Sequence, residues 1–76
     1  MSKRDKLIQK IKNAKSAEFE EIDQLLTQLG FSRRNESSHY TYANTPYVIV
    51  IARRSGKPVK RVYLENVKDL MEQMGL

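Results

Sequence analysis

The chain of 76 residues carries 14 Lys and Arg against nine Asp and Glu, one His and no Cys. The absence of cysteine excludes disulfides and thiolate metal sites, and a single histidine excludes a His-rich zinc site. No apolar run approaches the roughly 20 residues that span a bilayer, and residues 1–15 lack the apolar core of a signal peptide. We therefore expect one small soluble cytoplasmic domain with no membrane segment.

Positive charge is distributed unevenly along the chain. Residues 1–15 carry six bases against one acid, and residues 16–29 carry four acids and no base. Residues 30–62 then hold seven bases against one acid, and residues 63–76 return to a net charge of −2. Because phosphate contacts release condensed counterions, so dense a basic segment favours nucleic acid as a partner. The alternative is a solvated basic face that only keeps the protein soluble.

Two helices are expected first. Residues 3–13 place a short apolar stripe on one side and lysines elsewhere, which predicts a short helix. A stronger stripe of apolar residues at helical spacing runs from residue 19 to residue 29 and predicts a second helix. Ser16 is the expected N-cap of this second helix, and Gly30 suits the left-handed position just after its last turn.

Three strands follow, separated by two turns. The expected strands are residues 31–35, 39–43 and 47–52, with turns at 36–38 and 44–46. Alternation in the middle strand places His39 and Thr41 on the face opposite Tyr40 and Tyr42. The third strand is rich in β-branched residues, and we expect it to be the most buried.

A loop at residues 55–58, rimmed by Arg53, Arg54 and Lys60, leads to a last amphipathic helix that ends near Gly75. The predicted order is helix, helix, three strands, helix, in which the first helix is optional. We expect an α+β fold in which the two main helices pack on one face of a three-stranded antiparallel sheet. The other face of such a sheet is left partly open.

His39 is the one side chain whose ordinary pKa allows a change of charge near neutral pH. It stands among clustered cations, namely Arg33, Arg34, Arg53, Arg54, Lys57, Lys60 and Arg61. An imidazole in such surroundings suggests action on a phosphodiester. The alternative is a surface histidine that caps a turn.

The chain resembles the HicA family of toxins at Gly30–Phe31, at Ser38–His39 and in the β-rich residues 48–51. The family consists of small basic mRNA interferases with a double-stranded-RNA-binding-domain-like fold. The resemblance covers residues 16–76 and implies a ribonuclease domain there, preceded by a basic helical extension at 1–15. The family turn reads Gly-Ser-His, and its glycine is Ser37 here; a serine resists positive φ and obstructs close approach of an RNA backbone.

The resemblance implies a metal-independent RNA endonuclease, without a cofactor, in which His39 is the catalytic residue. Imidazole can take a proton from a ribose 2′-OH, which then attacks the adjacent phosphorus. Cations stabilise the charge that develops on the phosphoryl oxygens, and the expected RNA contacts are Ser38, Arg33, Arg34, Arg53, Arg54, Lys57, Lys60 and Arg61. Because one histidine cannot be base and acid at once, water or a cation protonates the leaving group, which predicts a modest rate.

The resemblance also implies a partner protein, a HicB-like antitoxin that holds the toxin in a hetero-oligomer, the free toxin being a monomer. Two other functions stay open. The chain could be a non-catalytic module whose basic face contacts A-form RNA by shape. It could also be a protein-interaction domain that uses the acidic helix of residues 16–29 and the open face of the sheet.

Overall fold

The structure is a computed structural model that describes residues 2–76. Met1, the first residue of the expected basic extension, lies outside the described residues. The elements, in the predicted order, are α1 (Lys3–Lys12), α2 (Phe19–Gln28), β1 (Ser32–Glu36), β2 (His39–Asn44), β3 (Tyr47–Ala52) and α3 (Arg61–Gln73). None of these helices has the length and apolarity needed to cross a membrane.

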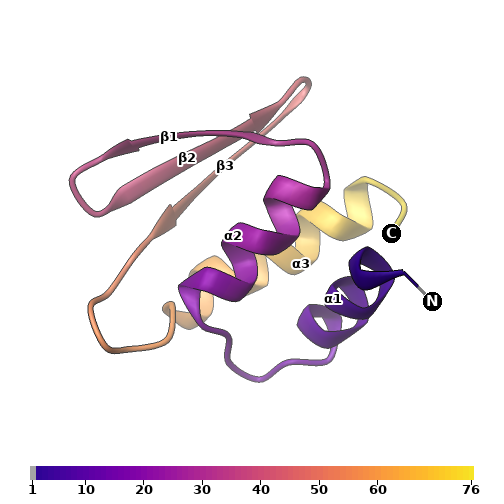
Figure 1. The fold of residues 1–76 in the computed structure, drawn as a ribbon, viewed down its shortest axis with the longest axis horizontal. Helices are drawn as coiled ribbons and strands as arrows, with labels where there is room; N and C mark the ends of the chain where they lie inside the picture. Colours follow the sequence, from indigo (N-terminus) through magenta and orange to yellow (C-terminus); the bar gives the residue numbers. More distant parts are fainter. Residues whose placement is uncertain (1) are drawn as a thin grey trace.

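The strands form one antiparallel sheet in the order β1-β2-β3. Figure 1 shows the three helices gathered on one side of this sheet, with its other face uncovered. The predicted α+β architecture, with a three-stranded antiparallel sheet and an additional N-terminal helix, is therefore confirmed.

The start of α2 differs from the prediction. Glu18, and not Ser16, is the N-cap, and its backbone N–H donates to Glu21 Oε1 over 3.0 Å in a capping box. The helix begins at Phe19 because this ring has to enter the core. Phe19 is buried there, with its centroid 4.6 Å from that of Tyr40.

The end of α2 is the one expected for a glycine after the last turn. Gly30 has φ +92°, and its N–H donates to the carbonyl of Thr27 over 3.1 Å. The N–H of Phe31 donates to the carbonyl of Leu26 over 3.0 Å, which completes a Schellman motif. The motif turns the chain so that Phe31 is buried and β1 begins directly after it.

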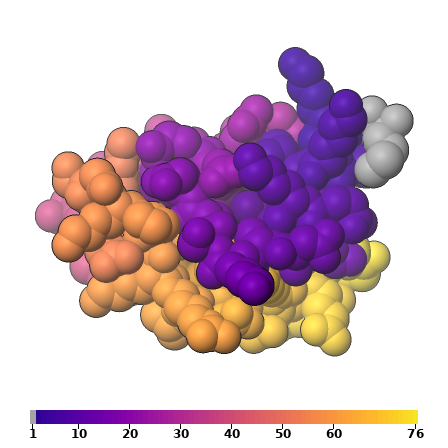
Figure 2. Space-filling view, turned by 90° about the horizontal axis from the view of Figure 1, so that it is seen from below, coloured from indigo at the N-terminus to yellow at the C-terminus, as the bar shows by residue number. Residues whose placement is uncertain are grey.

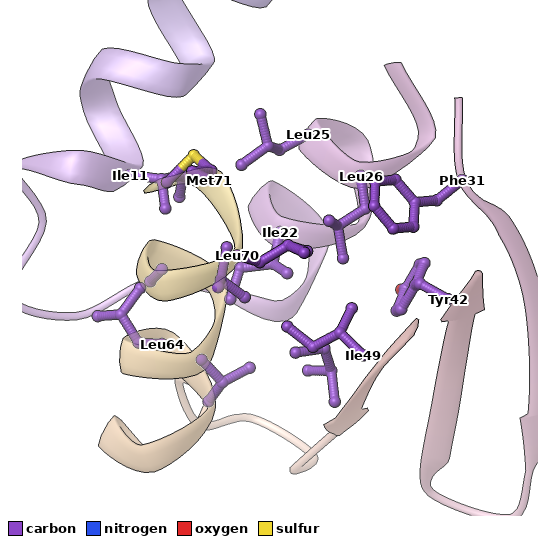
Figure 3. Packing of buried hydrophobic residues seen from close by; sticks show 14 of the residues in the cluster. Ile11, Ile22, Leu25, Leu26, Phe31, Tyr42, Ile49, Leu64, Leu70 and Met71 are labelled. Carbon is purple, nitrogen blue, oxygen red and sulfur yellow. The ribbon is translucent and has the colours of Figure 1, made fainter. Parts of the chain in front are cut away.

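The hydrophobic core lies between the helices and the inner face of the sheet. Figure 3 shows Ile22 of α2, Leu70 of α3 and Ile49 of β3 meeting in this space. Ile49 and Ile51 give β3 two buried side chains, more than either other strand contributes. The prediction that β3 is the most buried strand therefore holds, but only for its inner face, since Val48 and Val50 on the outer face are exposed.

The N-terminal helix belongs to the same core. Ile11 of α1 is fully buried, and Lys68 of α3 donates a 2.6 Å hydrogen bond to the carbonyl of Ala14, just after α1. The N–H of Val59 donates to the carbonyl of Ala17 over 3.0 Å. Figure 2 looks onto this side and shows α1, the segment after it and α3 as one continuous surface. The described part of the extension thus completes the helical layer.

Candidate functional site

His39 is the first residue of β2 and follows a two-residue turn made of Ser37 and Ser38. Its side chain is exposed on the open face of the sheet. Tyr40 and Tyr42 point to the other face of the strand and lie on the helix side. The predicted orientation of His39 is therefore confirmed. An RNA strand could reach the imidazole without any rearrangement of the helices.

Glu36 is the residue of β1 that pairs with His39, whereas the sequence pattern predicts a turn at this residue. The register places Glu36 of β1 directly opposite His39, and Cβ atoms of such pairs lie about 4.5–5.5 Å apart. Two residues before Glu36 on β1, Arg34 lies on the same face, opposite Thr41. The open face thus places a carboxylate and a guanidinium beside the imidazole. A two-residue turn always brings its flanking residues together, and this was the available signal.

The opposite side of His39 adjoins a cation-rich loop, residues 53–60, which we call the basic loop. His39 pairs with Ala52, the last residue of β3. Beyond this pair, the N–H of Arg53 donates to the carbonyl of Ser38 over 2.8 Å. This bond prolongs the β2–β3 pairing by one position, so the basic loop begins beside the hairpin turn. Five of the seven predicted cations therefore lie in the basic loop or at Arg61, directly after it.

A pocket of about 400 Å³ opens at the same end of the sheet, on the helix side. It is bounded by the first turn of α2, the β1–β2 turn and the basic loop; the lining residues are Glu18, Glu20, Ser37, Ser38, Tyr40, Arg53, Arg54, Ser55, Gly56 and Lys57. His39 does not line this pocket, because its side chain points to the open face. Ser38 is the predicted contact residue that lies between the pocket and His39.

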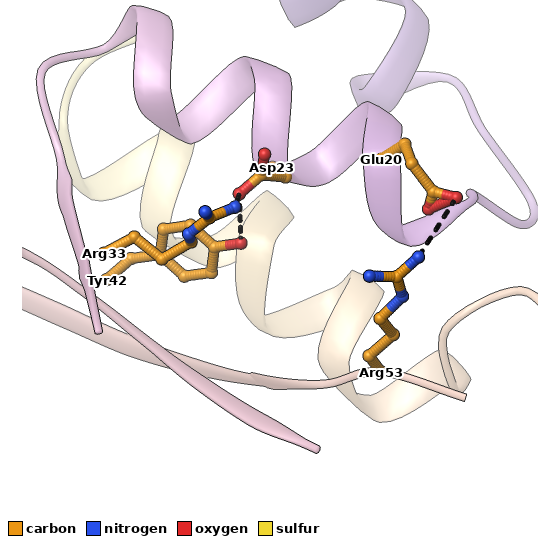
Figure 4. Close-up of polar contacts among 5 residues, drawn as sticks. All are labelled: Glu20, Asp23, Arg33, Tyr42 and Arg53. Atoms are coloured by element: carbon orange, nitrogen blue, oxygen red, sulfur yellow. Dashed lines mark hydrogen bonds and ion pairs between the residues drawn. The ribbon is translucent and has the colours of Figure 1, made fainter. Parts of the chain in front are cut away.

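Two of the predicted RNA-binding arginines pair with acids of α2, although 48% of each arginine side chain stays exposed. Arg33 Nη1 lies 2.9 Å from Asp23 Oδ1, and Arg53 Nη2 lies 4.0 Å from Glu20 Oε1, as Figure 4 shows. The Arg53 guanidinium also stacks over Phe19, 5.0 Å from the ring centroid. The hydrogen bond to Asp23 raises the pKa of Arg33. These two side chains therefore tie the sheet to α2.

The same Asp23 oxygen accepts a hydrogen bond from a second side chain. The hydroxyl of Tyr42 donates to Asp23 Oδ1 over 2.7 Å. Burial, reinforced by this hydrogen bond, raises the pKa of the Tyr42 phenol. Tyr42 thus stays neutral at any physiological pH and serves as a buried anchor for Asp23, which explains a polar-tipped side chain in the core.

Of the other five predicted cations, two contact other residues of the chain and three form no ion pair among the described residues. Arg54 donates from Nε and Nη2 to the carbonyl of Pro58 over 3.1 and 2.6 Å, and so fixes the shape of the basic loop. Arg61 lies 4.0 Å from Glu65 and is otherwise exposed. Within residues 2–76, Arg34, Lys57 and Lys60 are exposed and form no ion pair. Among the seven predicted cations, these three are exposed without an acidic partner in this part of the chain and are therefore the first candidates for phosphate contacts.

The turn before His39 has an unusual backbone. Ser37 has φ +56°, and it is the non-glycine residue with positive φ among residues 2–76. This is the position at which the HicA pattern has glycine. The positive φ supplies a physical reason for glycine there, because a Cβ atom destabilises this conformation.

Residues 2–76 contain no group of three or more His, Cys, Asp or Glu side chains placed to hold a metal ion. No family model, no curated protein and no solved structure matches the chain. The likeness to the HicA family therefore rests on the quoted residues.

Proposed function

We propose that the protein is a HicA-type toxin, a metal-independent RNA endonuclease that cleaves mRNA in the cytoplasm on a double-stranded-RNA-binding-domain-like fold. One observation carries most of the support. The register of His39 with Ala52, continued by the bond from Arg53 N–H to the Ser38 carbonyl, brings the single imidazole and the basic loop to one end of the sheet. A general base beside phosphate-binding cations is what cleavage of a phosphodiester requires.

The proposed reaction uses the open face of the sheet. His39 takes the proton of a ribose 2′-OH, and the 2′-oxygen attacks the adjacent phosphorus. The bond from phosphorus to the 5′-oxygen of the next nucleotide breaks, and that oxygen takes a proton from water or a cationic side chain. The products are a 2′,3′-cyclic phosphate and a 5′-hydroxyl. No step needs a metal ion.

Two open-face residues assist His39 in this proposal. Arg34, two positions from Glu36 on the same face, supplies positive charge to the phosphoryl oxygens. Glu36 accepts a hydrogen bond from the second ring nitrogen, which orients the imidazole and stabilises its protonated form during the reaction. Lys57 and Lys60 hold the neighbouring phosphates from the basic loop.

A HicB-like antitoxin is the proposed protein partner. The net charge of +5 favours a partner whose contact surface is acidic, since complementary charge speeds association and suppresses wrong pairings. An acidic segment over the basic loop and His39 would exclude RNA from the same surface. Inhibition would then follow from competition for the cations.

The test is cleavage of a defined RNA by the purified protein in the presence of a chelator. The parent is expected to leave 2′,3′-cyclic phosphate ends, and His39→Ala is expected to leave the RNA intact. Thr41→Ala, a substitution on the same strand and face, is the control and should still cleave. RNA that is bound by the parent but never cut would instead favour the non-catalytic RNA-binding module. A chain that neither binds nor cuts RNA would favour the protein-interaction domain.

A further inference from the structure

The two edges of the sheet differ sharply in chemistry. The edge strand β1 carries Arg33, Arg34 and Glu36 among its five residues, and charged edges are a usual protection against pairing with another chain. The opposite edge strand, β3, reads Tyr-Val-Ile-Val-Ile-Ala and contains neither a charge nor a proline. One edge is thus protected and the other is left able to accept a strand.

The outer hydrogen-bonding groups of β3 can be identified from one bond. The N–H of Arg53 points toward β2, because it donates to Ser38. Since successive residues of a strand direct these groups to alternate sides, the N–H and C=O groups of Val48, Val50 and Ala52 point outward. They have no neighbouring strand among residues 2–76.

The exposed apolar side chains gather at this same edge. Val48, Val50 and Val62 are the large hydrophobic residues most exposed in residues 2–76, at 66%, 40% and 58%. The first two lie on β3. Val62 is on α3 and shares one helix face with Asn66 and Asp69, because the three residues are spaced four and three positions apart. Asn66 and Asp69 border a groove of about 490 Å³ between α3 and β3. An apolar strand edge with a flanking groove is the arrangement that accepts an added strand.

Charge complementarity identifies the occupant. The basic loop follows the Ala52 end of β3. Asp69 and Glu72 of α3 lie toward the Tyr47 end, because Tyr47 and Gln73 are linked there by a 3.5 Å contact between the Tyr47 hydroxyl and the Gln73 carbonyl. A two-fold axis beside Val50 would pair β3 with an antiparallel copy of itself, and it would bring the basic end of each chain to the acidic end of the other.

We propose that the protein forms a homodimer through antiparallel pairing of β3 with β3 of a second copy, which joins the two sheets into one. With Val50 opposite the Val50 of the other copy, Val48 faces Ala52, and every outward-pointing N–H and C=O of the strand gains a partner. The contact is isologous and closes after two copies. The proposal replaces the expectation of a monomeric free toxin and does not depend on ribonuclease activity.

The first experiment measures the mass of the purified chain by sedimentation equilibrium over a wide range of concentration. The parent is expected to be a dimer, and Val50→Lys, which puts a charge on the two-fold axis, should raise the dimer dissociation constant at least about tenfold. Ser32→Lys, an exposed substitution at the β1 edge, is the matched control and should leave the dimer intact. A parent that is monomeric throughout, or a Val50→Lys variant that dimerises as tightly as the parent, would overturn the proposal.

Amide hydrogen exchange provides a second readout that needs no variant. The amides of Val48 and Val50 should be slow to exchange at dimer concentrations and fast on dilution. The amides of Ile49 and Ile51, which point to β2, should stay protected at both concentrations. Fast exchange at Val48 and Val50 under all conditions would show that the edge is unpaired. If the amides of Val48 and Val50 became slow to exchange only when a different protein was added, that protein would be the partner of the β3 edge. The homodimer proposal would then be wrong.

Discussion

Arg33 of β1 and Asp23 of α2 are joined by a 2.9 Å ion pair on the helix side of the sheet. Arg34, the residue after Arg33, points to the open face and has no acidic partner in the described chain. Two adjacent arginines therefore have different surroundings: Arg33 is partly exposed and paired with an acid of α2, and Arg34 points toward the proposed RNA surface.

This difference predicts opposite effects of two similar substitutions. Arg33→Ala should lower the melting temperature slightly, because it removes a partly exposed contact between β1 and α2, and should leave RNA affinity almost unchanged. Arg34→Ala should keep the melting temperature and weaken RNA binding and cleavage. Thermal melts and RNA titrations on both variants provide the comparison. Equal losses of RNA affinity would mean that Arg33 leaves Asp23 when RNA binds.

The basic loop should contribute to the salt dependence of RNA binding. Each lost phosphate contact to single-stranded RNA reduces the magnitude of the negative slope of log K against log salt by roughly 0.7. Lys57→Ala combined with Lys60→Ala is therefore expected to reduce that magnitude by roughly 1.4. The control is Lys3→Ala with Lys6→Ala, an equal change of charge on α1, which Figure 1 places far from the basic loop. A control pair that reduces the magnitude of the slope as much would show that the RNA surface is not at the basic loop.

Glu36 should act on the catalytic step and not on RNA binding. Glu36→Gln keeps the size of the side chain but removes the charge that would stabilise a protonated imidazole. We expect kcat to fall roughly tenfold, equivalent to ~1.4 kcal/mol of barrier, while RNA affinity stays the same or rises slightly. Glu72→Gln on α3 makes the same change of charge elsewhere and should leave kcat unchanged. A Glu36→Gln enzyme with the parent kcat would remove Glu36 from the mechanism.

Ser37→Gly should stabilise the hairpin. Relief of a left-handed serine is worth about 1–2 kcal/mol, and the greater freedom of glycine in the unfolded chain offsets about 0.4–1 kcal/mol of this. The net expectation is a gain of about 0.5–1 kcal/mol in the free energy of unfolding, measured by urea denaturation. Cleavage should also rise if the serine side chain obstructs RNA. A less stable glycine variant would show that Ser37 makes a contact worth more than the strain.

The free energy of unfolding should fall in acid, because protonation of Glu21 removes the charge that pairs with Lys10. An ion pair with Lys10, and then a hydrogen bond from the N–H of Glu18, lower the pKa of Glu21 below its ordinary value of 4.5. A carboxyl with a lowered folded-state pKa stabilises the fold above pH 4.5, and this contribution is lost as the pH falls further. Glu21→Gln should flatten the dependence of unfolding free energy on pH in that range, whereas Glu72→Gln should not.

Much of the fold follows from local patterns. The bounds of β3 match the predicted residues 47–52, and the glycine stop at Gly30 has the expected positive φ. The alternation of β2 was enough to place His39 on the open face. Each of these features depends on residues that are neighbours in sequence, so single-sequence reasoning could reach it.

The missed features depend on residues that are distant in sequence. Ser16 and Glu18 are both plausible caps, and the burial of Phe19 against Tyr40 decided between them. Likewise, a count of cations does not show which ones will meet an acid. Asp23 is ten residues from Arg33 along the chain and faces it only after α2 has packed on the sheet.

The hydrogen bond from Lys68 to the Ala14 carbonyl, between residues 54 positions apart, has a consequence for the order of folding. The three strands pair only with their neighbours in sequence, so the hairpins can form during synthesis as soon as residue 52 has left the ribosome. Until α3 emerges, α1 can pack only on α2, and the inner face of the sheet remains partly uncovered. A nascent chain therefore carries its histidine hairpin before it has a stable core, and the proposed ribonuclease activity should begin only once α3 has completed the core that contains Ile11 and Ile51.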